Sequence, residues 1–413
     1  MKKFVSVLLA VLFIMSVCVL PSFAYDYVEF SDEVVDYYNG LGLQGTKLNV
    51  YNWGEYISDE DVDVIKEFER LTGCKVNYTT FESNENMYSK LSGGGVSYDI
   101  IVPSDYAIDK LLAEGMLQKI DYRNVPNFEK YFDAEKYGYM VDGVVNGEKV
   151  SDYTVIYNVG TTVLIYNTKY IKEKPDSWSI MWDPQYDGKV LMFNNPRDAF
   201  AIAQFSLGQS INTTSTADWD AAADLLKKQR ELVHPTYVMD EIFTALESGD
   251  YWIGAYYAGD YELMHENNPD LDYVFPKEGV NTFYDGFCIP TGSQNKKGAE
   301  AFINFMMEPE IALANAEYIC YATANRSVME NDDFYLNESR AVYPEEGDIA
   351  YMEAFSDLPN DTLQYMNTLW IKVKGGNDSQ TVYFVFFACI LLIAVVIVAT
   401  VIKKKKMSKY YNV

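Results

Sequence analysis

Residues 47–81 read KLNVYNWGEYISDEDVDVIKEFERLTGCKVNYTTF, and this stretch changes its hydrophobic period twice. LNVYNW alternates apolar and polar residues as a half-buried strand does, and CKVNYTTF repeats that pattern. Between them, Val62, Ile65 and Phe68 recur at helical spacing, with Ser58 as the expected N-cap and Gly73 as the expected stop. A strand, a helix and a second strand in this order predict a parallel βαβ unit.

Later segments continue this alternation. We predict helices over ENMYSKLSGG and DYAIDKLLAEGM, strands over YDIIVPS, KVLMFNN, YWIGAYY and FYDGFCIP, and a strand pair over TVIYNVG and TVLIYNTK. From Lys296 the pattern is mainly helical, first to Ala316 and then to about residue 374. The fold class is therefore α/β. Because such sheets bind ligands at the carboxyl ends of their strands, the search for a site begins there.

The charge distribution indicates which partners the protein can have. The 413 residues include 60 acids and 33 bases, but residues 1–24 and 382–413 hold seven of the bases and none of the acids. The part between them carries 60 acids against 26 bases. Such a field repels nucleic acid and attracts cations, although acidity also simply keeps an exported protein soluble.

The two ends have the patterns of targeting segments. Residues 1–24 resemble a secretory signal peptide cleaved after Ala24; Cys18 would suit a lipoprotein, but the preceding Val17 is larger than lipoprotein signals carry. Residues 382–402 are apolar and uncharged, which predicts a transmembrane helix more readily than a buried core helix. Because four lysines follow, residues 403–413 are expected to form a basic cytoplasmic tail and 375–381 a linker. The protein would then be a single-pass membrane protein with an extracellular or periplasmic binding domain.

Few residues suit catalysis or metal binding. His234 and His265 are the only histidines, and there is no HExxH, paired CxxC or GxSxG motif, so we expect no enzyme, no metal and no cofactor. Cys74, Cys288 and Cys320 do not form a disulfide framework, and we interpret them as small hydrophobic residues.

Aromatic and acidic residues gather at the strand ends. They are Trp53, Glu55 and Tyr56 in YNWGEY, Ser104, Asp105 and Tyr106 in PSDY, Tyr257 and Asp260 in YYAGD, and Phe283 and Asp285 in FYDGF. Each alone could be a core ring, a turn or a cap. Together they suit a dication, because aromatic faces attract ammonium groups by about 0.5–2 kcal/mol each and carboxylates pair with the buried charge.

Several of these motifs resemble those of the spermidine/putrescine-binding proteins of bacterial ABC transporters. The resemblance covers roughly residues 47–375 and includes KLNVYNWGEY, YDIIVPSDYAIDKLLAEGM, SWSIMWDPQYDGKV, FPKEG and FYDGFCIP. It implies a two-lobed periplasmic-binding-protein-like fold of type II, with the ligand in a cleft between the lobes. The implied first lobe comprises residues 46–153 and 283–340, and the second comprises 154–282 and 341–374. Residues 25–45 are left as an acidic leader.

The resemblance also implies the ligand contacts. Trp53, Glu55, Tyr56, Ser104 and Tyr106 match the family's contacts in the first two strand-end loops, Asp198 matches an amine-binding acid, and Asp285 matches its central amine-binding aspartate. Tyr257 takes the place of a stacking tryptophan, whereas Asp260 and Tyr321 match residues of the putrescine type. Asn195 replaces an acid of the family. With Asp260 adding charge beside Asp285 at the opposite end of the slot, we predict a preference for putrescine over spermidine.

The resulting prediction is a membrane-tethered, monomeric receptor that captures a polyamine and delivers it to an ABC permease and its ATPase, without nucleic acid. Three alternatives stay open. They are a membrane-bound polyamine sensor, a receptor of the same fold for another cationic solute, and an adhesive or structural protein.

Overall fold

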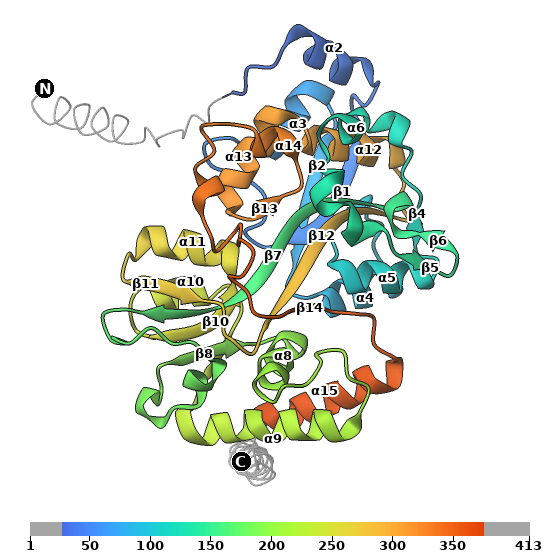
Figure 1. Ribbon diagram of the computed structural model, residues 1–413. Coiled ribbons are helices and arrows are strands. Elements are labelled where there is room, and N and C mark those ends of the chain that lie inside the picture. Colours follow the sequence, from blue (N-terminus) through green and yellow to red (C-terminus); the bar gives the residue numbers. More distant parts are fainter. Residues whose placement is uncertain (1–26, 376–413) are drawn as a thin grey trace, which may run out of the picture.

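Two long antiparallel strands, β7 (Thr154–Asn167) and β12 (Val280–Pro290), lie side by side and run through both halves of the protein. Figure 1 shows this computed structural model, which describes residues 27–375, with the two strands connecting an upper and a lower lobe. The predicted signal peptide, transmembrane helix and cytoplasmic tail lie outside the described residues. Within residues 27–375, no helix is long and apolar enough to cross a membrane.

The first lobe is built on the βαβ unit that the opening stretch predicts. Its sheet has the order β2-β1-β3-β12-β7, with β1 parallel to both β2 and β3. The helices and strands of this lobe are α2 (Asp32–Gly40), β1 (Lys47–Trp53), α3 (Val64–Thr72), β2 (Lys75–Phe81), α4 (Asn84–Ser92), β3 (Ile100–Ile101), α5 (Asp105–Ala113), β4 (Leu117–Gln118), α6 (Pro126–Tyr131), α7 (Ala134–Tyr137), β5 (Val144–Val145), β6 (Glu148–Lys149), α12 (Lys296–Met306), α13 (Pro309–Ile319), β13 (Ala322–Thr323) and α14 (Arg326–Met329), with short 3-10 helices at Tyr122–Asn124, Gly138–Val141, Val150–Asp152 and Tyr335–Glu338.

The second lobe repeats the plan with the order β7-β10-β8-β9, in which β8 is parallel to β9 and to β10. Its elements are β8 (Val190–Phe193), α8 (Pro196–Ser206), α9 (Thr216–Val233), β9 (Thr236–Val238), α10 (Ile242–Glu247), β10 (Ile253–Tyr257), α11 (Ala258–Asn267), β11 (Leu271–Val274), β14 (Met352–Ala354) and α15 (Asn360–Gly375), with 3-10 helices at Trp178–Trp182 and Pro184–Tyr186. The two-lobed α/β architecture is therefore as predicted.

The crossing strand differs from the sequence prediction. TVIYNVG and TVLIYNTK are not a pair of strands but one continuous strand, β7. Val155, Ile156 and Tyr157 pack in the core of the first lobe, whereas the run from Val163 to Tyr166 packs in the core of the second. The strand therefore passes between the lobes a few residues later than the predicted boundary at residue 154.

Residues 25–45 are more than a leader, because α2 packs on the first lobe. Tyr38 is completely buried; its hydroxyl donates to Glu308 Oε1 at 2.8 Å and accepts from Asn304 Nδ2 at 2.7 Å. Its acidic composition concealed this helix, because Tyr38 is its only fully buried side chain and Val34, Val35 and Tyr37 are only partly buried against the core.

Two other element predictions need correction. Helix α3 begins at Val64 rather than after Ser58, because Asp63 is the N-cap whose side chain accepts from the Lys66 amide. The predicted long helical region ends at Ile319 and is already divided at Pro309; residues 320–359 contain only short elements before α15. The stop at Gly73 is confirmed.

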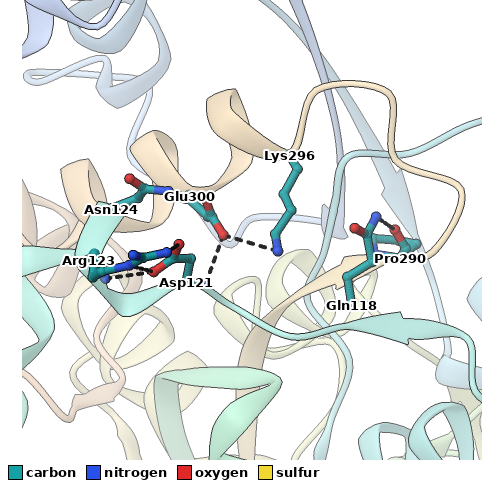
Figure 2. A network of polar contacts seen from close by, with 7 residues as sticks. All are labelled: Gln118, Asp121, Arg123, Asn124, Pro290, Lys296 and Glu300. Atoms are coloured by element: carbon teal, nitrogen blue, oxygen red, sulfur yellow. Dashed lines mark hydrogen bonds and ion pairs between the residues drawn. The ribbon is translucent and has the colours of Figure 1, made fainter.

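A buried carboxylate joins α12 to the loop after β4. Glu300, which is only 2% exposed, accepts from the Asp121 amide at 2.8 Å and from Asn124 Nδ2 at 2.7 Å, and it lies 3.5 Å from Lys296 Nζ (Figure 2). Because charge-assisted hydrogen bonds to backbone fix a loop strongly, Glu300 anchors this corner of the first lobe.

Candidate functional site

A cavity of about 90 Å³ lies between the lobes, where the carboxyl ends of strands from both sheets meet. The predicted ligand contacts line it, whereas Asp105, the acid of PSDY, does not: the lining includes Trp53, Glu55, Tyr56, Ser104, Tyr106, Asp198, Tyr257, Asp260, Phe283, Asp285 and Tyr321. The lining combines aromatic rings with carboxylates. It contains no lysine and no arginine among the described residues.

Asp285 lies on β12 at a bulge in its pairing with β7. Its carboxylate is 3% exposed and accepts two short hydrogen bonds within the first lobe, from the Tyr56 hydroxyl at 2.7 Å and from Ser104 Oγ at 2.6 Å. Burial raises the pKa of Asp285 to about 6, and the two hydrogen bonds oppose this shift. The carboxylate is thus oriented by two hydroxyls but has no cation beside it in the part of the chain that the structure describes.

Asp198 lies in the first turn of α8 in the second lobe. It accepts from the Tyr257 hydroxyl at 3.0 Å and from Asn195 Nδ2, and burial raises its pKa to about 7. Asn195 is the N-cap of α8, and its Oδ1 also accepts from the amides of Arg197 and Asp198. Asn195 therefore caps the helix and orients Asp198.

Asp260 lies in the first turn of α11 and accepts from the Tyr321 hydroxyl at 3.0 Å, a hydrogen bond that crosses from the first lobe to the second. Burial raises the pKa of Asp260 to about 8, and the charges of Asp240 and Glu55 add to the shift. Asp260, Asp198 and Asp285 accept from three different tyrosine hydroxyls, those of Tyr321, Tyr257 and Tyr56, so the three acids hold separate positions in the cavity lining.

The lobes approach each other closely where the turn after β1 faces Asp240 of the second lobe. Glu55 has the left-handed φ of 45°, unusual for a residue with a side chain, and follows Gly54 in the turn after β1. A Cβ atom at Gly54 would lie 2.9 Å from Asp240 Oδ2 of the opposite lobe. A side chain at position 54 would therefore displace the Asp240 carboxylate from its place against the opposite wall.

Aromatic side chains form the remaining walls. The indole of Trp53 donates to the Val102 carbonyl at 2.8 Å and packs on Phe81, with ring centroids 4.4 Å apart. Tyr257 and Phe283 meet edge to face at 5.4 Å. Because the polar edge of Trp53 is already bonded, its face is the part of the ring that can interact with a ligand.

Sequence reasoning missed Asp240, which follows the carboxyl end of β9 and is contacted by the Tyr256 hydroxyl at 3.1 Å. The strand-end rule would have found it, but β9 has only three residues and shows no alternation. Asn84 was also missed; its amide donates to Ser104 Oγ and to the Tyr106 hydroxyl, which fixes both. Phe355 lines the cavity from the loop after β14.

The arrangement is suited to binding an organic cation. Cys74, Cys288 and Cys320 are free and buried, which confirms their interpretation as hydrophobic residues. Six carboxyl groups line the cavity between aromatic faces, those of Glu55, Glu82, Asp198, Asp240, Asp260 and Asp285. An ammonium group placed there would exchange water for carboxylate oxygens and ring faces.

Comparisons with known proteins agree with this geometry. A family model described as bacterial extracellular solute-binding protein matches residues 63–340, which span both lobes. The spermidine/putrescine-binding periplasmic protein of Salmonella typhimurium is 33% identical over 80% of this chain and 92% of its own length. The putrescine-binding periplasmic protein SpuD of Pseudomonas aeruginosa is 29% identical over the same shares of the two chains. Among solved structures, a spermidine/putrescine ABC transporter protein from Listeria monocytogenes is 36% identical, with a TM-score of 0.73 over 80% of this chain and 99% of that chain.

Proposed function

Because this chain belongs to the bacterial extracellular solute-binding protein family, we propose that it captures a polyamine outside the cytoplasm and delivers it to an ABC permease. Three buried carboxylates carry the proposal. Asp198, Asp260 and Asp285 face one aromatic-lined cavity, each accepts a tyrosine hydroxyl, and none forms an ion pair within residues 27–375. Buried carboxylates without a cation are costly, and a ligand with several ammonium groups would supply the missing charges.

The distribution of these acids bears on which polyamine is bound. The three buried acids are held by three different tyrosine hydroxyls, Asp285 by Tyr56, Asp198 by Tyr257 and Asp260 by Tyr321. With these three acids in the cavity, a triamine can pair each of its ammonium groups with one carboxylate. A diamine can pair its two ammonium groups with any two of the three. We therefore propose that spermidine binds at least as tightly as putrescine.

Calorimetry with putrescine, spermidine, spermine and arginine on the full chain in detergent micelles tests this function. We expect binding of putrescine and spermidine and none of arginine. Asp260→Asn should lower the affinity for spermidine by roughly tenfold or more and the affinity for putrescine by less, because a diamine can still pair with Asp198 and Asp285. Asp272→Asn, which removes a charge from β11 outside the cavity, is the control and should change neither affinity. Binding of none of the polyamines would refute the function. A putrescine affinity tenfold above that of spermidine would refute only the proposed ligand preference.

We also propose that residues 382–402 tether the receptor to the membrane, because the run is apolar, uncharged and followed by four lysines. A tether would keep a single-chain receptor close to its permease. Protease added to intact cells should then digest the binding domain and leave a protected C-terminal fragment of about 4 kDa. Release of the receptor into the medium without any protected fragment would argue against the tether.

A further inference from the structure

Arg197 is a buried cation that the proposed ligand contacts do not use. It lies in the first turn of α8, beside Asp198, and is only 1% exposed. Within residues 27–375 it forms no ion pair; its Nη2 donates to the Ser356 carbonyl at 3.0 Å, while Nε and Nη1 have no hydrogen-bond acceptor. Its charge acts through space on Asp105, Asp198 and Asp357 and opposes the rise of their pKa values, but none of them pairs with it directly, so its close contacts are with other groups.

Two aromatic rings enclose the guanidinium. Its Cζ atom lies 4.7 Å from the ring centroid of Tyr106 and 4.4 Å from that of Phe355, and the two rings meet edge to face at 5.7 Å. Both distances are well within the range of cation–π attraction. Arg197 and Phe355 belong to the second lobe and Tyr106 to α5 of the first, so one of the two contacts crosses the cleft.

Each half of this contact is held in place by its own lobe. The Tyr106 hydroxyl accepts from Asn84 Nδ2 at 3.2 Å and donates to Glu85 Oε1 at 3.1 Å, which fixes the ring and increases the electron density of its face. On the other side, Phe355 and the Ser356 carbonyl orient the guanidinium. The faces of a guanidinium are weakly hydrated, so covering one with a ring costs little.

We propose that Arg197 fastens the two lobes together by docking on Tyr106, and that this contact slows the release of bound ligand. The inference rests on the proposed function, in which ligand is held between closed lobes. The contact joins the two lobes and must break before they can separate, so it acts mainly on dissociation. Arg197 is thus a positioning residue, because it touches rings that line the cavity rather than the ligand.

Stopped-flow measurements of spermidine dissociation from the full chain in detergent micelles test the proposal. Arg197→Met keeps the length of the side chain and removes the cation; we expect the dissociation rate to rise about tenfold and the association rate to change less than twofold. Arg197→Lys should restore only part of the slow dissociation, because an ammonium group lacks the planar face of a guanidinium. Arg230→Met is the matched control, because Arg230 lies on α9 of the same lobe and donates to the Val373 carbonyl away from the cavity.

A double-mutant cycle separates fastening from mere support of the fold. If the contact is real, the increase in dissociation rate in the double variant Tyr106→Leu, Arg197→Met should be much smaller than the product of the increases in the two single variants. Independent effects of the two changes, or an unchanged rate in Arg197→Met, would overturn the inference. A wild-type chain that binds no polyamine would instead refute the proposed function. In that case single-molecule energy transfer between dyes on the two lobes still tests the fastening, since Arg197→Met should lower the closed fraction and an unchanged fraction would overturn it.

Discussion

Replacing Asp285 by asparagine should lower the affinity for putrescine and for spermidine by roughly a hundredfold or more. The carboxylate is buried at the centre of the cavity, and its two oxygens are oriented by Tyr56 and Ser104 rather than neutralised by a cation. An amide of the same shape keeps the packing but offers an ammonium group no charge. Calorimetry on the two proteins measures the loss directly.

Two controls separate this loss of charge from damage to the fold. Asp105→Asn removes a neighbouring buried carboxylate, outside the cavity lining, that accepts from the Tyr106 amide; affinity should change less than about fivefold. The ligand-free Asp285→Asn protein should be as stable as the wild type or more stable. The raised pKa of Asp285, about 6, means that its ionised form costs the folded state roughly 1–3 kcal/mol at neutral pH. Unchanged polyamine affinity in Asp285→Asn would exclude the cavity as the amine site.

Sequence reasoning reached the cavity residues because their positions follow from strand periodicity. Trp53 and Asp285 lie where alternating runs end or are interrupted by a charge, and a parallel sheet brings such ends together. Because β9 has only three residues and shows no alternation, Asp240 was not predicted as a site residue. The resemblance supplied Asp198 and Tyr321, which lie in loops or helix starts whose place in space no local pattern reveals.

Other features could not be foreseen because they depend on contacts between distant segments. Gly160 in TVIYNVG suggests a break between two strands, yet a Cβ there would meet the Phe283 ring at 2.5 Å, so the glycine serves close packing within a continuous strand. Arginine is rarely buried, so nothing in the sequence indicates that Arg197 lies in the interior. It is covered by Tyr106 on α5 and by Phe355 in the loop after β14, which are far from it in the sequence.

Spermidine affinity should rise steeply with pH, by on the order of a thousandfold between pH 6 and 8.5. Burial raises the pKa values of Asp285, Asp198 and Asp260 to about 6, 7 and 8, so part of this set is protonated in the ligand-free protein at neutral pH. The amines of the ligand stay charged over this range, because alkylammonium groups titrate near pH 10. Binding therefore requires the carboxylates to ionise, and at pH 7 it should release between one and two protons.

The sign of the stability change follows from the same shifts. Carboxyl groups whose pKa is raised on folding bind more protons in the folded state, so the ligand-free protein loses stability as the pH rises from about 4 to about 8. Bound polyamine opposes that loss, and the increase in melting temperature caused by ligand should grow with pH. Calorimetry in phosphate and in Tris, whose ionisation enthalpies differ, counts the released protons. Asp260→Asn removes the group with the highest pKa and should flatten the affinity profile between pH 7 and 8.5, even though affinity itself is lower. A wild-type affinity that stays constant from pH 6 to 8.5, with the same heat in both buffers, would mean that the three carboxylates do not hold the amines.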